Sequence, residues 1–245
     1  ISDKLRPTFA KQQDCFLQVS AQLHDHGIHL LDYEGLNTQQ TTHLQTYFEE
    51  QIFPVLTPLA VDPGHPFPYI SNLSLNLAVV IREADSEETY FARVKVPKVL
   101  PRFIQLPKSL LSPNTLWAAV PLEQVIGHNL TFLFPGMVVE DYYTFRITRN
   151  ADLFVEEDDA DDLMLALEQE LRKRRLGGSL VRMELQADTS LEVRTTLLTE
   201  MGLAEDDIYD VKGLIGLGDL ITLTSLPLPD RKSTRLNSSH PSRPR

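Results

Sequence analysis

The stretch FPVLTPLAVDPGHPFPYISNLSLNLAVVI (residues 53–81) decides the fold of this 245-residue chain. Five of the chain's 16 prolines fall within it: Pro54, Pro58, Pro63, Pro66 and Pro68. Each proline fixes φ and removes a backbone donor, so neither a helix nor a central strand is expected across residues 54–68. From Leu73 to Ile81 the apolar residues alternate, which predicts a buried strand. The stretch therefore predicts a stiff, extended entry that leads into one core strand.

The segments around this stretch predict further strands joined by helices. The acidic sequence READSEET (residues 82–89) is expected to turn the core strand into a return strand over residues 90–96. Other strand-like segments lie at residues 28–32, 117–120, 137–148, 180–185 and 208–211. Helical patterns lie at residues 1–26, 37–52, 122–133, 156–175 and 189–201, with a last helical turn at 219–223. An antiparallel hairpin followed by strand–helix units favours an α+β fold, with a mixed or antiparallel sheet and packed helices.

Two helix starts carry the capping-box signature, in which two residues three positions apart cap each other's backbone donors. The first pairs Asn37 with Gln40, and the second pairs Thr189 with Glu192. Gly202 is expected to end the second helix. The apolar residues expected on that helix are Leu191, Leu198 and Met201.

The chain is expected to have three parts. Residues 1–26 form one helix with a narrow apolar stripe, which a lone helix cannot bury. We therefore expect the last helix of a truncated N-terminal bundle whose other helices lie upstream of Ile1. Residues 27–229 form the α+β domain. The chain begins without Met, which favours a fragment.

Residues 230–245 are expected to be a non-native, disordered tail. They contain one large apolar residue, Leu236, and no periodicity. The sequence DRKSTRLNSSH at their start resembles the in-frame translation of a sequencing-library adapter. The alternative is a natural basic tail.

Composition narrows the class of protein. Apolar residues make up 42% of the chain, enough for a core, and their longest run is far too short to span a bilayer. A single cysteine, Cys15, rules out an internal disulfide and suits the reducing cytoplasm. The net charge is −11 although the tail is basic. Because so acidic a body repels polyanions, no nucleic-acid partner is expected.

Arg146 and Arg149, within FRITRNADL (residues 145–153), are candidate phosphate contacts. Two guanidinium groups can hold phosphate as a fork. The alternative is that they pair with the acidic run at residues 156–162. The basic run at residues 172–175 has the same two interpretations: phosphate contact, or a solvated helix end.

No metal-ligating, catalytic or cofactor-binding residue is predicted. The group His24, Asp25, His26 and His29 is explained by imidazoles near the C-terminal end of a helix. The acidic run at residues 156–162 suits a helix start without needing Mg²⁺. Gly213, Gly216 and Gly218 lack the spacing of a phosphate-binding loop and are interpreted as turn glycines.

Three motifs carry a resemblance to a known family. They are FPVLTPLAVDPGHPFPYISNLSLNLAV, FARVKVPKVLPRF (residues 91–103) and FRITRNADL. In this order and spacing they closely resemble the long, multidomain bacterial polyphosphate kinases, and the similarity extends through almost all of residues 1–229. The resemblance implies a parent with a helical N-terminal domain, a head (middle) domain and two C-terminal catalytic domains. Residues 1–26 would be the last N-domain helix and residues 27–229 the head domain.

The resemblance also implies a reaction and a role for this segment. The family reversibly transfers the γ-phosphoryl group of ATP to inorganic polyphosphate through a phosphohistidine, with Mg²⁺. The family's catalytic and nucleotide-binding residues lie outside this chain, so none is assigned here. No catalytic role is assigned to His65 in their place. The head helps to form a homodimer, so we expect an architectural, dimerising segment that is inactive alone. The expected location is the cytoplasm, with peripheral membrane association as the alternative.

Two other function classes stay open at this point. One is a stand-alone, non-catalytic interaction module with a head-domain fold. The other is an enzyme whose site lies within this segment, around Arg146, Arg149 and the basic helix end.

Overall fold

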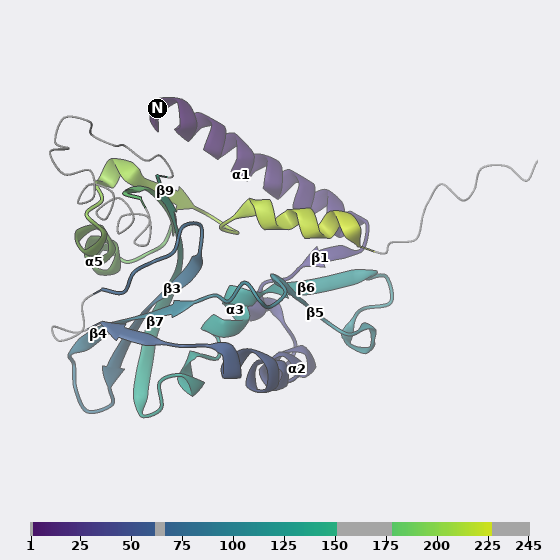
Figure 1. Cartoon of the computed structure of the whole chain (residues 1–245). Helices are drawn as coiled ribbons and strands as arrows, with labels where there is room; N and C mark the ends of the chain where they lie inside the picture. Colours follow the sequence, from purple (N-terminus) through teal and green to yellow (C-terminus); the bar gives the residue numbers. More distant parts are fainter. Residues whose placement is uncertain (1, 62–66, 151–177, 227–245) are drawn as a thin grey trace, which may run out of the picture.

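The computed structural model describes residues 2–61, 67–150 and 178–226 (Figure 1). The expected helix at residues 156–175, His65 and the tail at residues 230–245 lie outside these ranges.

Two sheets organise the described residues, and they confirm the predicted α+β class (Figure 1). The larger sheet has the strand order β2-β4-β3-β7-β8-β9, and its neighbours are antiparallel except for the parallel pair β8–β9. Its strands are β2 (Leu59–Val61), β3 (Leu75–Glu83), β4 (Thr89–Lys95), β7 (Met137–Arg149), β8 (Leu180–Gln186) and β9 (Ile208–Val211). The smaller sheet has the order β1-β6-β5, formed by Ile28–Leu30, Trp117–Pro121 and Phe103–Gln105.

The core strand expected from the alternating pattern is β3, which lies between β4 and β7. Leu77 and Val79 are fully buried on one face of the sheet, and Ala78 is fully buried on the other. In the described part of the proline-rich entry the one strand is β2, which is short and lies at the edge of the sheet. This position agrees with the expectation that prolines exclude a central strand, because an edge strand leaves one row of donors unpaired.

Helices cover both faces of the sheet. The α-helices are α1 (Ser2–Asp25), α2 (Thr38–Tyr47), α3 (Leu122–Gly127) and α5 (Leu191–Met201). A π-helical turn, η2 (Phe48–Ile52), and a 3-10 turn, η3 (Phe53–Val55), extend α2. The other 3-10 turns are η1 (Tyr33–Gly35), η4 (Lys108–Leu110), η5 (Leu130–Phe132), η7 (Glu205–Asp207) and η8 (Leu217–Ser225).

The helix ends confirm some predictions and correct others. The capping box of Asn37 and Gln40 is present at the start of α2. The cap of α5 is Ser190, because the hydroxyl of Thr189 instead donates to the carbonyl of Gln186 in the preceding turn, at 2.6 Å. Gly202 ends α5 in the left-handed conformation, with φ 62°.

Two helical predictions differ from the structure in detail. The helix expected over residues 122–133 is only six residues long, because Asn129 donates its side-chain amide to the carbonyl of Val125 at 2.9 Å and so closes the helix end. On α5, Leu191 is 79% exposed, whereas Val193 and Leu197 are buried. Leu198 and Met201, which were also expected on the buried face, are partly buried and pack against the same cluster as Val193 and Leu197, so Leu191 alone among the three departs from the expectation.

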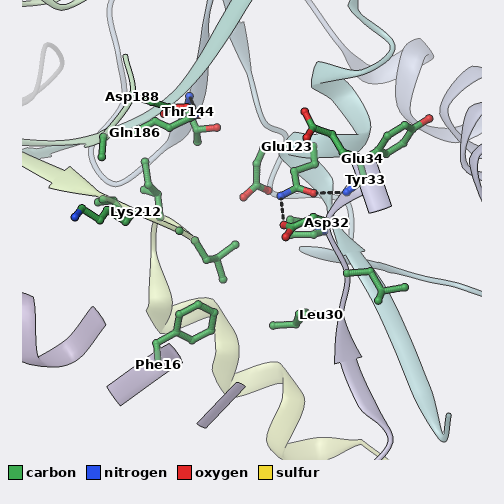
Figure 2. Close-up of a pocket in the computed structure, with 18 of the residues that line it drawn as sticks. Phe16, Leu30, Asp32, Tyr33, Glu34, Glu123, Thr144, Gln186, Asp188 and Lys212 are labelled. Carbon is green, nitrogen blue, oxygen red and sulfur yellow. Dashed lines mark hydrogen bonds between the residues drawn. The ribbon is translucent and has the colours of Figure 1, made fainter. Parts of the chain in front are cut away.

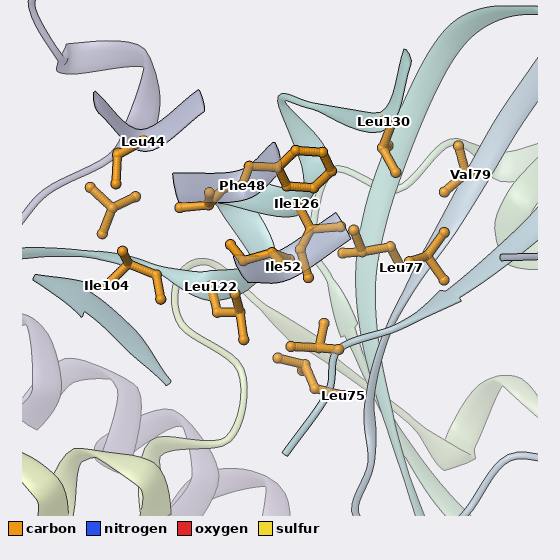
Figure 3. Packing of buried hydrophobic residues seen from close by; sticks show 14 of the residues in the cluster. Leu44, Phe48, Ile52, Leu75, Leu77, Val79, Ile104, Leu122, Ile126 and Leu130 are labelled. Carbon is orange, nitrogen blue, oxygen red and sulfur yellow. The ribbon is translucent and has the colours of Figure 1, made fainter. Parts of the chain in front are cut away.

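Two buried clusters lie on opposite faces of the large sheet. The larger cluster joins β3 and β4 to α2, η2 and α3 around Phe48, Leu77 and Ile126 (Figure 3). The second cluster packs α5 against Phe145 and Ile147 of β7. Figure 1 shows η8 (yellow) alongside α1, where Leu23 packs in a third, small cluster with residues of η8. This arrangement leaves a cleft between α1 and the sheets.

Candidate functional site

The described residues form a cleft of about 800 Å³ (Figure 2). Its walls come from α1, the end of β1 with η1, α3, β7, and the segments that follow β8 and β9. These elements are far apart in the sequence, so the cleft exists only in the folded domain.

Gln124 of α3 fixes the wall formed by η1. Its carbonyl oxygen accepts a hydrogen bond from the backbone N–H of Tyr33 at 2.8 Å, and its amide nitrogen donates to Oδ1 of Asp32 at 3.0 Å (Figure 2). One side chain therefore holds both a backbone donor and a carboxylate in place at the rim.

Three aromatic side chains stand together beside Gln124. The rings of Tyr33 and His128 are stacked, with centroids 4.3 Å apart, and the ring of Tyr142 meets His128 edge-on at 6.0 Å. Burial lowers the pKa of His128, although the charge of Glu34 opposes that shift. Burial also raises the pKa of Tyr142 to about 12. Both groups are therefore neutral at pH 7, and the aromatic wall carries no charge.

A buried ion pair anchors the wall formed by α3, and its carboxylate, Glu123, also lines the cleft. Arg102 donates from Nη2 to Oε1 of Glu123 at 2.6 Å and to the carbonyl of Ile215 at 3.1 Å, and from Nε to Asp219 at 3.2 Å. Burial lowers the pKa of Arg102 to about 10, with the carboxylate of Asp219 opposing, so the guanidinium stays charged at neutral pH. These contacts tie α3 to the segment containing η8.

The guanidinium group of Arg149 is occupied by contacts within the domain. Its Nε donates to the carbonyl of Ile70 at 2.9 Å, its Nη1 donates to the carbonyl of Gly178 at 3.0 Å, and the guanidinium lies 4.4 Å from the ring centroid of Tyr69. The loop it holds contains Leu73, which has a φ of 55°, a conformation that costs an L-residue free energy. Arg149 thus clamps a strained entry loop onto the end of β7.

The guanidinium group of Arg146 contacts a different part of the domain from that of Arg149. Its Nη1 lies 3.9 Å from a carboxylate oxygen of Glu184, and it packs so closely on Gly216 that an added Cβ there would lie 2.9 Å from Nη1. The described contacts do not join the two guanidinium groups in a fork. Phosphate contact by Arg146 and Arg149 stays a prediction, and the alternative partners at residues 156–162 lie outside the described ranges.

Replacing Arg149 with methionine is expected to lower the free energy of unfolding by about 1–2 kcal/mol, because two hydrogen bonds and a cation–π contact are lost. Urea denaturation measures this loss. The matched control is Lys98→Met, at an exposed position. Equal losses in the two variants would show that Arg149 does not act as a clamp.

Acidic side chains dominate the charge of the cleft. They are Asp32, Glu34, Glu123 and Asp188, and they face a single lysine, Lys212. Within the described ranges, no group of three or more His, Cys, Asp or Glu residues is arranged to hold a metal ion. His24 and His29, from the histidine group of the sequence analysis, do not line the cleft, and their rings pack edge-on against each other with centroids 4.2 Å apart. The lining therefore suits neither a polyanion nor a single bound metal ion.

The sequence analysis missed the aromatic and acidic residues of the cleft. Tyr33, His128 and Tyr142 come from three separate elements, and no spacing in the chain links them. Among the helices that the structure describes, none combines the length and apolar character needed to cross a membrane.

Comparison with known proteins places the chain in a family. The model of the polyphosphate kinase middle domain matches residues 39–223. Polyphosphate kinase of Aphanizomenon baltica is 56% identical over 244 residues, which cover 98% of this chain and 63% of the relative. Polyphosphate kinase of Synechocystis sp. is 54% identical over 237 residues, which cover 95% of this chain and 33% of the relative.

A solved structure shares the fold. The crystal structure of polyphosphate kinase from Porphyromonas gingivalis superposes with a TM-score of 0.71 and 24% identity, covering 98% of this chain and 34% of that one. This chain thus corresponds to only part of the length of these proteins. On the family-model match and the identity to its relatives, the chain belongs to the polyphosphate kinase family.

Proposed function

We propose that this chain is part of a polyphosphate kinase, an enzyme that reversibly transfers the γ-phosphoryl group of ATP to inorganic polyphosphate through a phosphohistidine, with Mg²⁺. The match of residues 39–223 to the family's middle domain carries this proposal. The activity belongs to the whole protein, of which this chain spans a part. We also place the protein in the cytoplasm, in keeping with its one free cysteine, Cys15.

Within that enzyme, the segment acts as architecture and is inactive alone. Arg102 and Arg149 are committed to contacts within the domain, and Arg146 packs against Glu184 and Gly216. The charged side chains that line the cleft are mainly carboxylates, which repel a polyphosphate chain. These features support catalysis by residues outside this chain, and binding of ATP, ADP and Mg²⁺ there as well.

Self-association is the second part of the proposed role. Phe53 and Phe132 are each about 40% exposed, and both rings pack against the buried ring of Phe48, with centroids 6.2 and 5.8 Å away. Val55, exposed to 46%, lies beside Phe53 in η3. Large apolar side chains grouped on a surface mark contact sites between proteins. This apolar patch (Phe53, Val55 and Phe132) is the surface we assign to a homodimer.

An assay of ATP-dependent polyphosphate synthesis tests the architectural role. The purified 245-residue chain is expected to give no product, whereas the full-length Synechocystis relative serves as the positive control. Measurable turnover by the chain would place catalytic groups within it and contradict the proposal.

Sedimentation analysis tests the dimer. The chain is expected to self-associate, and Phe53→Lys is expected to weaken the association because a charge would be buried in the contact. Val99→Lys is the control, since Val99 is 80% exposed and lies outside the apolar patch. A monomeric chain, or equal effects of the two substitutions, would contradict this role.

The source DNA beyond the codon for Pro229 separates a fragment from a stand-alone module. Adapter sequence, or a continuing reading frame into further domains, agrees with the proposal. A genuine stop codon there would favour an independent interaction module that has kept the head-domain fold.

A further inference from the structure

The cleft carries carboxylates on two facing walls. Asp32 and Glu34 stand on the wall formed by η1, and Asp188 stands across from them, just beyond the end of β8 (Figure 2). Phe16 of α1 and Leu30 of β1 line the side closed by α1 (Figure 2). The cleft therefore offers separated negative charges with apolar surface near them.

These three carboxylates are available to a ligand. In the described ranges, none of Asp32, Glu34 and Asp188 forms an ion pair, whereas Glu123 is neutralised by Arg102. Asp32 accepts one hydrogen bond, from Gln124, through Oδ1. Lys212 offsets only part of this charge. An uncompensated negative lining raises the local concentration of cations.

The spacing of the carboxylates selects the kind of cation. No three acidic or histidine side chains in the described part of the chain converge closely enough to hold one metal ion. A compact divalent ion needs six or more oxygen ligands around one point. An elongated cation that carries its charges at separate positions can instead reach both walls.

The remaining lining suits an aliphatic stem. The stacked rings of Tyr33 and His128 and the ring of Tyr142 offer aromatic surface, which attracts ammonium groups and packs against methylene groups. The volume of about 800 Å³ lies within the range of small-molecule sites.

We propose that the cleft binds an aliphatic polyamine, with amino groups at Asp32 and Glu34 on one wall and at Asp188 on the other, and with its methylene stem along Phe16 and Leu30. This inference concerns the cleft alone and stands whether or not the chain is part of a kinase. It gives the domain a ligand of opposite charge to polyphosphate.

Isothermal titration of the 245-residue chain with spermidine tests the proposal. Binding is expected at low ionic strength and is expected to weaken when salt is raised to about 0.15 M, because screening shortens the reach of the carboxylates. n-Butylamine, which has one amino group and a similar stem, is expected to bind at least about tenfold more weakly, since it reaches only one wall.

Charge-removing variants locate the site. Asp32→Asn and Asp188→Asn are each expected to weaken spermidine binding about three- to fivefold, and the double variant about tenfold or more. Asp85→Asn removes the same charge from the exposed β3–β4 connection and is expected to leave the affinity unchanged. Thermal denaturation of each variant checks that the fold is retained.

Three results would overturn the proposal. The first is the absence of spermidine binding at low ionic strength. The second is equal affinity for n-butylamine, or displacement of spermidine by an equal concentration of Mg²⁺, since either means that no bridge between the two walls is needed. The third is an affinity of folded Asp32→Asn and Asp188→Asn equal to that of the Asp85→Asn control.

Discussion

Replacing Glu123 with alanine is expected to lower the free energy of unfolding by about 3–5 kcal/mol, because the change leaves a buried arginine without its partner. Glu123 is only 4% exposed, and it receives the guanidinium of Arg102 at 2.6 Å. The remaining contacts of Arg102 are to the carbonyl of Ile215 and to Asp219, which is half exposed. Neither replaces a buried carboxylate.

Urea denaturation measures this effect, with Glu87→Ala as the control at an exposed position. The control is expected to change stability by no more than about 0.5 kcal/mol. The double variant Arg102→Met/Glu123→Leu is expected to recover most of the loss, because the buried charge is then removed together with its partner. A Glu123→Ala chain as stable as the control would mean that Arg102 finds another partner or reaches water.

Replacing Gly127 with alanine is expected to lower the free energy of unfolding by about 2–3 kcal/mol through overpacking. Gly127 is buried at the end of α3, and an added Cβ would lie 2.2 Å from Cζ of Tyr142. Alanine is the better helix former, so intrinsic propensity favours the substitution and the expected loss is the cost of moving the ring. Because the ring of Tyr142 meets His128, the aromatic wall of the cleft is expected to shift with it.

Gly35→Ala is the matched control, since a Cβ at that position has no atom within 4 Å. Its stability is expected to stay within about 0.5 kcal/mol of the parent. Gly127→Ala/Tyr142→Ala is expected to be less destabilised than the sum of its two single changes, because the small side chain at 142 leaves room for the new methyl group. Equal stabilities of Gly127→Ala and Gly35→Ala would show that the ring moves without cost.

Local sequence patterns were sufficient to predict most of the strands and helix caps. The alternation of Leu75, Leu77 and Val79 predicts β3 because side chains on a strand repeat with period two. The pairing of Asn37 with Gln40 predicts the start of α2 because the capping box is satisfied by residues three apart. Both devices act over a few residues, so tertiary contacts do not alter them.

Competition from neighbouring groups explains the local errors. Thr189 has the right chemistry to cap α5, but the carbonyl of Gln186 takes its hydroxyl, and Ser190 becomes the cap. The pattern at residues 122–133 is helical throughout, yet Asn129 satisfies the carbonyl of Val125 and ends α3 early. In each case the hydrogen bond forms with a second partner that the local pattern does not include.

Arg146 and Arg149 illustrate why sequence spacing does not predict which partners a site residue contacts. Sequence spacing places Arg146 and Arg149 close together and so suggests a shared ligand. In the fold, a bulge between Thr148 and Arg149 changes the register, and each guanidinium finds a different partner. Partners such as the carbonyl of Gly178 lie far along the chain, which no local pattern encodes.

The sequence by itself determined the α+β class, the position of the core strand, the absence of a central strand from the proline-rich entry and the family of the protein. The core strand and its proline-rich entry follow from backbone chemistry and short-range periodicity in residues 53–81, the class follows from the order of elements along the chain, and the family follows from the resemblance of three motifs. Only the tertiary structure decided the cleft, because its walls come from elements as distant as Phe16 and Ile215. Their side chains acquire a common environment only when burial of the apolar clusters brings those elements together.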